Sequence, residues 1–197
     1  MPRLSCFASF WLAAALTAAA QEAPAIVTAA RSQIGVTVDY DGSYAAIAYP
    51  NGDLPIERGV CTDVVIRAMR KSHGLDLQQA VHLDMKANFQ AYPKIWGLKS
   101  TDRNIDHRRV PNLQTFFKRK GWSLPVGKDF KAYQPGDLVT CMVGVTLPHI
   151  MIVSDKRNAE GIPLVIHNIG GGAREEDCLQ QFPITGHYRP PAAQEKK

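Results

Sequence analysis

The spacing of apolar residues changes part-way along the chain, and this change restricts the fold more than any other feature. Before Gly121 the apolar residues recur at helical spacing, and after Tyr133 they form short runs separated by turn residues. The helical spacing predicts helices over 22–33, from Cys61 to about His73, over 77–92, and from Asn112 to Gly121. The short runs predict strands over 138–143, 148–155, 164–169 and 184–189. Short strands joined by tight turns form antiparallel sheets, so we predict an α+β domain with N-terminal helices packed on an antiparallel β-sheet.

The N-terminus has the pattern of an export signal. Arg3 gives it a basic start, an alanine-rich apolar run follows from Leu4 to Thr17, and small residues occupy 18–20. The apolar run is short for a membrane span and no basic stop follows it. We therefore predict a signal peptide over 1–20, cleaved after Ala20, and a periplasmic or secreted protein without stable membrane insertion after cleavage. The remaining chain predicts a single domain over 21–190 and a disordered tail over 191–197.

The charge of the chain is moderately basic, with a formal net charge of +5 and a pI of about 9.1. Basic residues cluster at 107–109 and 118–120. Neither cluster is interleaved with aromatic residues, so we predict no nucleic-acid partner. These charges suit an anionic cell envelope or an ordinary solvated surface.

The stretch 59–70 carries the first candidate for chemistry. Gly59 permits the unusual backbone angles of a tight turn, and an amphipathic helix begins at Cys61. Thr62 and Asp63 lie where side chains accept free backbone N–H groups. The positive end of a helix favours the thiolate form of Cys61, which is the nucleophilic form. The alternative is a buried cysteine that only packs, and this stretch by itself leaves both interpretations open.

Two histidines occupy strand positions that suit a partner for such a cysteine. A catalytic cysteine requires a base and a third group that orients the base. His149 opens one predicted strand and His167 lies near the end of the next, so on neighbouring strands they come close together. His149 is then the base and His167 the orienting residue, with Asn168 as a competing choice on the opposite face. Each histidine can also be a satisfied interior residue. His107 is the other histidine whose polar surroundings suit a cleft.

The cysteines leave the oxidation state of the mature chain open. Cys6 belongs to the predicted signal, so Cys61, Cys141 and Cys178 remain, and an odd number leaves at least one thiol unpaired. A disulfide between Cys141 and Cys178 and three reduced, buried thiols are both compatible with the sequence. One cysteine and two histidines can bind zinc, but Cys-x-x-Cys and His-Glu-x-x-His spacings are absent. We therefore predict no metal and no cofactor.

An irregular, tyrosine-rich segment covers 36–55, just before Cys61. It can line a substrate cleft beside the cysteine or form a surface loop whose tyrosines pack inward.

Several motifs together resemble a known family. They are Arg58-Gly59-Val60-Cys61-Thr62-Asp63-Val64 and the segments 104–113, 135–139 and 166–170. These motifs resemble the bacterial DUF1287 family, a relative of the NlpC/P60 branch of the papain-like cysteine peptidases. In that branch a cysteine at a helix start precedes a strand histidine and a polar residue, often histidine, on a second strand. The resemblance implies a papain-like, NlpC/P60-type fold and cleavage of amide bonds in cell-wall peptides.

The resemblance also implies roles for individual residues. It makes Cys61 the nucleophile, His149 the base and His167 the orienting residue, and it makes Tyr40 the first candidate for a substrate-binding tyrosine. The usual Asp-Cys-Ser-Gly signature is replaced here by Val-Cys-Thr-Asp at 60–63, so the substrate-side contacts differ. We expect an exported cysteine amidase or endopeptidase whose partner is peptidoglycan or its peptide fragments. The alternatives are an acyl or amide transferase with the same fold and a non-catalytic cell-wall-binding module.

Overall fold

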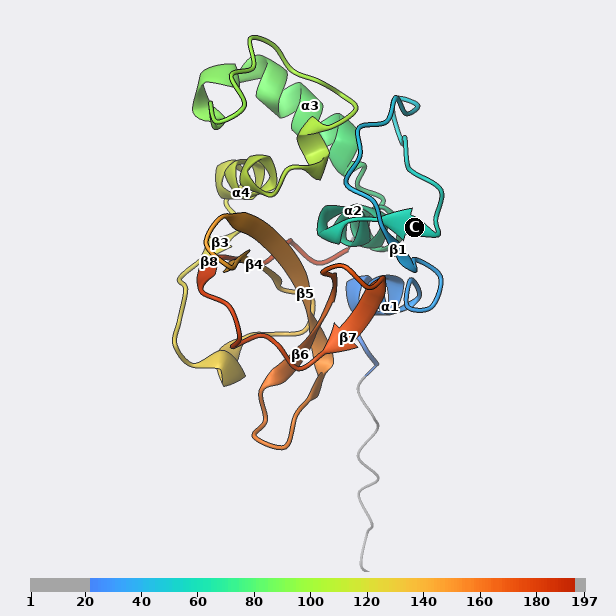
Figure 1. Cartoon of the computed structure of the whole chain (residues 1–197). Helices are drawn as coiled ribbons and strands as arrows, with labels where there is room; N and C mark the ends of the chain where they lie inside the picture. Colours follow the sequence, from blue (N-terminus) through green and yellow to red (C-terminus); the bar gives the residue numbers. More distant parts are fainter. Residues whose placement is uncertain (1–21, 194–197) are drawn as a thin grey trace, which may run out of the picture.

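The computed structural model describes residues 22–193 and shows a mixed α+β domain with an antiparallel six-stranded sheet (Figure 1). The predicted signal peptide and the last residues of the predicted tail, 194–197, lie outside the described residues. The helices are α1 (Ala25–Arg31), α2 (Cys61–His73), α3 (Leu77–Ala87) and α4 (Val110–Arg119), with short 3-10 turns η1 (Phe89–Ala91), η2 (Asp106–Arg108) and η3 (Phe130–Ala132).

The strands form two sheets in the described part of the chain. A short parallel pair joins β1 (Asp39–Tyr40) to β2 (Arg58–Gly59), immediately before α2. The main sheet has the order β3-β8-β4-β5-β6-β7, and its neighbouring strands are antiparallel. Its members are β3 (Ser123–Leu124), β4 (Leu138–Val143), β5 (Leu147–Arg157), β6 (Pro163–Asn168), β7 (Ala173–Glu176) and β8 (Ile184–Tyr188).

Helix α2 and strand β4 have the bounds that the sequence predicted. Gly74 ends α2 in the left-handed conformation with φ of 64°, which is the usual role of glycine after a helix. The helix predicted over 77–92 is shorter in the structure, because α3 ends at Ala87 and η1 follows. Strand β7 was missed: its residues Ala-Arg-Glu-Glu are mostly charged and show no apolar alternation.

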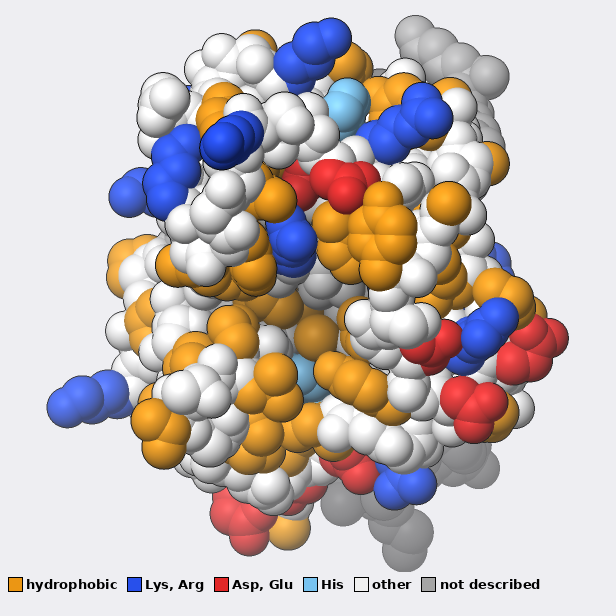
Figure 2. Space-filling view, turned by 45° about the horizontal axis from the view of Figure 1, so that its top comes forward, with side chains coloured by type: hydrophobic (Ala, Val, Ile, Leu, Met, Phe, Trp, Pro, Cys, Tyr) orange, Lys and Arg blue, Asp and Glu red, His pale blue; other side chains and the backbone are white. Residues whose placement is uncertain are grey.

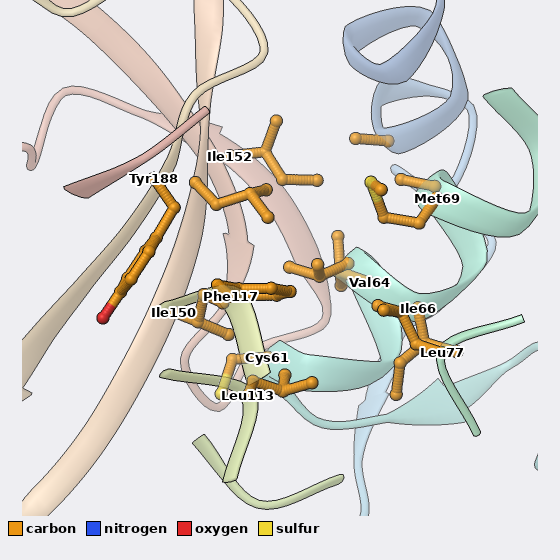
Figure 3. Close-up of a cluster of buried hydrophobic side chains, with 14 of the residues drawn as sticks. Cys61, Val64, Ile66, Met69, Leu77, Leu113, Phe117, Ile150, Ile152 and Tyr188 are labelled. Atoms are coloured by element: carbon orange, nitrogen blue, oxygen red, sulfur yellow. The ribbon is translucent and has the colours of Figure 1, made fainter. Parts of the chain in front are cut away.

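The hydrophobic core is divided between the two faces of the main sheet. On one face, α1, α2 and α4 pack over side chains such as Ile150, Ile152 and Ile166. Figure 3 shows Val64 and Met69 of α2 on the side of this core opposite Ile150 and Ile152. A second cluster on the other face includes Val139, Cys141, Met151 and Val153. The alternation of side chains along β5 therefore divides its residues between two cores.

Helix α2 lies in the middle of the first core. All of its residues from Cys61 to Met69 are buried, including the charged Asp63 and Arg67. Within the described residues, no helix is long and apolar enough to cross a membrane.

Gly172 allows β7 to approach the segment before β1. The N–H of the next residue, Ala173, donates to the Thr37 carbonyl at 2.8 Å. Gly172 has φ of +83°, and a Cβ there would lie 2.7 Å from the Thr37 oxygen and 2.8 Å from the Val38 Cα. Both contacts are with backbone atoms, so a side chain would force these two segments apart.

We predict that Gly172→Ala destabilises the protein more than Gly121→Ala does. Gly121 has a similar φ of +73° but nothing within 4 Å of its added Cβ, so alanine there costs only the conformational strain of about 1 to 2 kcal/mol. Alanine at Gly172 adds a backbone clash to the same strain. Urea denaturation followed by circular dichroism measures both losses, and equal losses would contradict this account.

Candidate active site

A buried ion pair fixes the start of α2. The Asp63 carboxylate accepts a hydrogen bond from the Val60 backbone N–H at 2.7 Å, as its predicted first-turn position requires. The Arg108 guanidinium donates to both oxygens of the same carboxylate, each at 3.0 Å. The two side chains are only 3% and 4% exposed, so this bidentate pair is shielded from solvent.

Arg108 also organises the segment that carries Tyr40. Its remaining N–H groups donate to the carbonyls of Asp41 at 2.9 Å and Ser43 at 3.0 Å. The carbonyl of Arg108 itself accepts from the Thr62 hydroxyl at 3.1 Å. Thr62 therefore does not cap its own helix, as the sequence had led us to expect, but ties α2 to η2.

Gly59 is required for space rather than for unusual backbone angles. It is absent from the glycines with left-handed φ, contrary to the prediction from sequence. A Cβ at Gly59 would lie 2.9 Å from the Cβ of Asp63. The glycine therefore lets the chain pass close to the carboxylate that Arg108 holds.

Cys61 lines a cavity of about 250 Å³ at this end of α2. Figure 2 shows a hollow on this side of the molecule, bordered by hydrophobic side chains and with a histidine visible inside it. The other lining residues come from β1, η2, the starts of α4 and β5 and the segments that connect these elements, namely Tyr40, Gly42, Val60, Trp96, Ile105, Arg108, Arg109, Val110, Pro111, Leu147 and Pro148. Arg109 lies over the Trp96 ring at 4.3 Å. The cavity thus combines a thiol, apolar walls and a stacked guanidinium.

Tyr40 lies at this cavity because β1 pairs with β2. Tyr40 is in register with Gly59, two residues before the cysteine, and burial together with the nearby Cys61 and Asp63 raises the pKa of its hydroxyl. His107 does not line the cavity. It is buried, and burial lowers its pKa to about 4.

The Cys61 thiol is held near the start of β5. Figure 3 shows the side chain beside Leu113 and Ile150, and the Ile150 backbone N–H donates toward its sulfur. This N–H and the N–H groups of the first helical turn favour the thiolate, as expected at a helix start. Burial has the larger effect and raises the pKa of Cys61 to about 11, with the Asp63 charge acting in the same direction. Burial therefore outweighs the helix-start effect that the sequence predicted, and Cys61 at neutral pH is a thiol.

The structure brings the two predicted histidines together. Strands β5 and β6 are neighbours, and His149 Nε2 lies 2.7 Å from His167 Nδ1. Both side chains are buried. Asn168 points the other way, as the alternation predicts, and its amide donates to the Gly59 carbonyl at 2.9 Å. His167 is thus the residue that contacts His149, while Asn168 supports the segment that leads into Cys61.

Glu176 extends the histidine pair and was not identified from sequence. Its Oε2 lies 2.9 Å from His167 Nε2, and the Cys178 sulfur lies 3.5 Å from the same nitrogen. Glu176 was missed because β7 was missed. Glu176 lies two positions before Cys178, and alternate residues of an extended segment share a face. Once this segment is known to be extended, the spacing predicts that the two side chains lie on the same side.

The carboxylate sets the direction of this hydrogen-bond chain. An ionised carboxylate only accepts, so His167 Nε2 must carry a proton. A neutral His167 then accepts at Nδ1, which requires His149 to donate from Nε2. The remaining nitrogen of a neutral His149, Nδ1, is therefore left as an acceptor. This is the tautomer that a base for a thiol requires.

Both rings are neutral at rest. Burial, followed by the neighbouring His167, lowers the pKa of His149 to about 3. Burial also lowers the pKa of His167, although the Glu176 carboxylate opposes the shift. The site therefore holds a thiol and two neutral imidazoles in place of a preformed ion pair.

Cys61 and His149 approach the same end of β5 from different sides. Among the described residues, no hydrogen bond joins the Cys61 thiol to the His149 ring. Ile150 belongs to the same core as Cys61, whereas His149 pairs across the sheet with Cys141 of the second core. The described contacts therefore do not place His149 against Cys61, and the predicted role of His149 as the base requires the two side chains to approach each other when substrate binds.

Of the two oxidation states that the sequence left open, the structure contains the reduced one. Cys61, Cys141 and Cys178 are free and buried in the described chain.

Comparison with known proteins places the chain in a family. The family described as "Domain of unknown function (DUF1287)" matches residues 27–190. The chain belongs to this family. It is also 54% identical over 165 residues to "Uncharacterized protein YijF" of Escherichia coli (strain K12), which covers 84% of this chain and 80% of that protein. No solved structure matches.

We predict that Asp63→Asn destabilises this DUF1287 protein by about 3 to 5 kcal/mol, because it leaves the Arg108 charge buried without its partner. The exposed ion pair between Arg58 and Asp41, at 3.2 Å, provides the control. Arg58→Gln should change the free energy of unfolding by less than about 1 kcal/mol. Chemical denaturation of both variants measures the difference, and a small loss for Asp63→Asn would remove the ion pair from its proposed role.

We also predict slow alkylation of Cys61 at neutral pH. The thiolate is the reactive form, and the raised pKa leaves little of it below pH 9. The rate of Cys61 modification by iodoacetamide, located by mass spectrometry, should therefore keep rising as the pH increases to about 10. Rapid modification at pH 6 would show a preformed ion pair instead.

Proposed function

We propose that this protein is a cysteine hydrolase, an amidase or endopeptidase that cleaves amide bonds in peptidoglycan peptides. We further propose that its α+β domain is of the papain-like, NlpC/P60 type. The observation that carries the proposal is the directed chain from Glu176 through His167 to His149, beside a cavity lined by a helix-start cysteine. Such a chain leaves His149 Nδ1 as a proton acceptor at the end of β5 that Cys61 approaches.

In the proposed reaction the peptide carbonyl lies in the cavity against Cys61. The thiol gives its proton to His149 Nδ1 as the sulfur attacks the carbonyl carbon, and the backbone N–H of Cys61 donates to the developing oxyanion. His149 then protonates the leaving amine as the carbon–nitrogen bond breaks, which leaves a thioester on Cys61. Water attacks the thioester, gives its proton to His149, and Cys61 recovers a proton as the acid product leaves.

Glu176 and His167 act as positioning residues in this mechanism. When His149 accepts the thiol proton it becomes an imidazolium inside the protein, which burial disfavours. His167 accepts its Nε2–H, and the carboxylate of Glu176 stabilises the resulting positive charge through His167. The Cys61 thiol therefore transfers its proton only when the negative charge that develops on the sulfur stabilises the positive charge that develops on the His149 ring.

Three observations support peptidoglycan as the partner and the periplasm or exterior as the location. The motifs around Cys61 and His149 resemble those of cell-wall peptidases, the N-terminus has the pattern of an export signal, and the net charge of +5 suits an anionic envelope. Arg109 adds a feature of the cavity itself. Among residues 22–193, the Arg109 side chain donates to Asp106 at 3.3 Å and to no other residue, so its other N–H groups are available to a carboxylate of the peptide.

We predict that the purified protein releases fragments from isolated sacculi and that Cys61→Ala abolishes this release. His149→Ala should lower the rate by about 10²- to 10⁴-fold, the usual contribution of a general base. Glu176→Ala should lower it less, and Glu176→Gln should recover part of the loss because its amide oxygen still accepts from His167. Liquid chromatography with mass spectrometry measures the fragments.

Cys141→Ala is the matched control, since Cys141 is also buried but belongs to the other core. It should retain activity. Products in the presence of an added amine separate hydrolysis from transfer, because a transferase would join the amine to the acyl group. Binding to sacculi without any released fragment would favour a non-catalytic wall-binding module and would refute the hydrolase.

A further inference from the structure

A second set of donor atoms meets at the far end of the histidine pair. His167 Nε2, a carboxylate oxygen of Glu176 and the Cys178 sulfur all lie within 4.8 Å of one another. His167 and Cys178 are buried, and Glu176 is partly exposed. The proposed reaction uses His167 and Glu176 but gives Cys178 no role. The thiol is therefore a buried nucleophilic group whose position the hydrolase does not explain.

The spacing of these atoms resembles the edges of a tetrahedral zinc site. With bonds of about 2.3 Å to sulfur and about 2.0 Å to nitrogen or oxygen, tetrahedral zinc holds sulfur and nitrogen about 3.5 Å apart. It holds nitrogen and oxygen about 3.3 Å apart. In this structure the sulfur–nitrogen distance is 3.5 Å and the nitrogen–oxygen distance is 2.9 Å. The third edge, between the Cys178 sulfur and the carboxylate oxygen, is within 4.8 Å, where tetrahedral zinc requires about 3.5 Å, and Glu176 lies partly at the surface, where its side chain can adjust.

We propose that His167, Glu176 and Cys178 form a binding site for Zn²⁺ that switches off the base of the proposed hydrolase. Thiolate, imidazole and carboxylate are all donors that zinc accepts, and water completes the fourth position on the exposed side of Glu176. Binding releases the thiol proton of Cys178 to solvent. The neighbouring Asp177 adds negative charge, while Arg174 opposes it from 3.9 Å on the other oxygen of Glu176.

The switch follows from the hydrogen-bond chain. Zinc on Nε2 of His167 requires that nitrogen to lose its proton, so the neutral ring carries its proton on Nδ1. His167 then donates to His149 Nε2, which is the usual second-shell arrangement for a histidine that binds zinc. His149 must now carry its own proton on Nδ1, and this nitrogen can no longer accept a proton from Cys61. The regulatory step rests on the proposed function, whereas the binding step does not.

Three buried cysteines allow a sharp test of the binding step. All variants carry Cys6→Ser, which removes the thiol of the predicted signal peptide from the measurement. Cobalt(II) and zinc are titrated into the purified protein, and the visible spectrum reports thiolate ligation of cobalt. We expect one metal per chain and a cobalt–thiolate band that Cys178→Ser removes, with affinity falling by roughly tenfold or more. Cys141→Ser is the matched control and should keep the band.

A competing site at the nucleophile gives a different pattern. If Cys61→Ser removes the band and Cys178→Ser keeps it, zinc binds at Cys61 and the proposal is wrong. Absence of any cobalt–thiolate band also overturns it. Neither result depends on activity, so both are distinguishable from failure of the hydrolase.

A separate activity measurement tests the switch. Zinc should inhibit fragment release from sacculi by the parent protein, and a chelator should restore it. Zinc inhibition that persists unchanged in Cys178→Ser would refute the switch.

Discussion

The buried ion pair between Asp63 and Arg108 is the interaction on which the candidate site depends. Burying two charges is costly, and the cost is offset only when geometry is good and the remaining donors are satisfied. Here Arg108 binds the carboxylate through two N–H groups and uses its other donors on backbone carbonyls. One residue pair therefore connects the start of α2, the Tyr40 segment and η2. All three contribute to the lining of the cavity beside Cys61, together with the starts of α4 and β5 and Trp96.

The same pair influences the chemistry of the cysteine. Asp63 places a negative charge in the first turn of α2, and that charge raises the pKa of Cys61 together with burial. A helix start would favour the thiolate, but here its own first-turn carboxylate works against it. The chemistry of the site consequently depends on which nitrogen atoms of His149 and His167 carry protons, and not on an ion pair between Cys61 and a histidine in the resting protein. A directed chain of hydrogen bonds suits such a site, because it decides which nitrogen of His149 accepts.

Local sequence patterns predicted the parts of this protein that local physics determines. The bounds of α2 follow from its apolar face and Gly74, and the pairing of His149 with His167 follows from two adjacent strands and side-chain alternation. The roles of Arg108 and Glu176 could not be predicted in this way. Arg108 lies 45 positions from Asp63, and no local spacing indicates that contact. Glu176 lies on a charged strand that apolar periodicity does not detect.

His167 Nε2 can hold a proton or a metal ion, but not both. With the proton, it donates to Glu176 and leaves His149 ready to accept; with the metal, it reverses the chain. Coupling between two such states is reciprocal, because binding free energies are linked. If zinc disfavours the active tautomer of His149, whatever favours that tautomer, including a substrate that draws Cys61 toward His149, must weaken zinc binding by the same factor. The tautomeric state of the histidine pair on β5 and β6 therefore determines two properties together: whether His149 can act as a base, and how tightly His167 binds zinc.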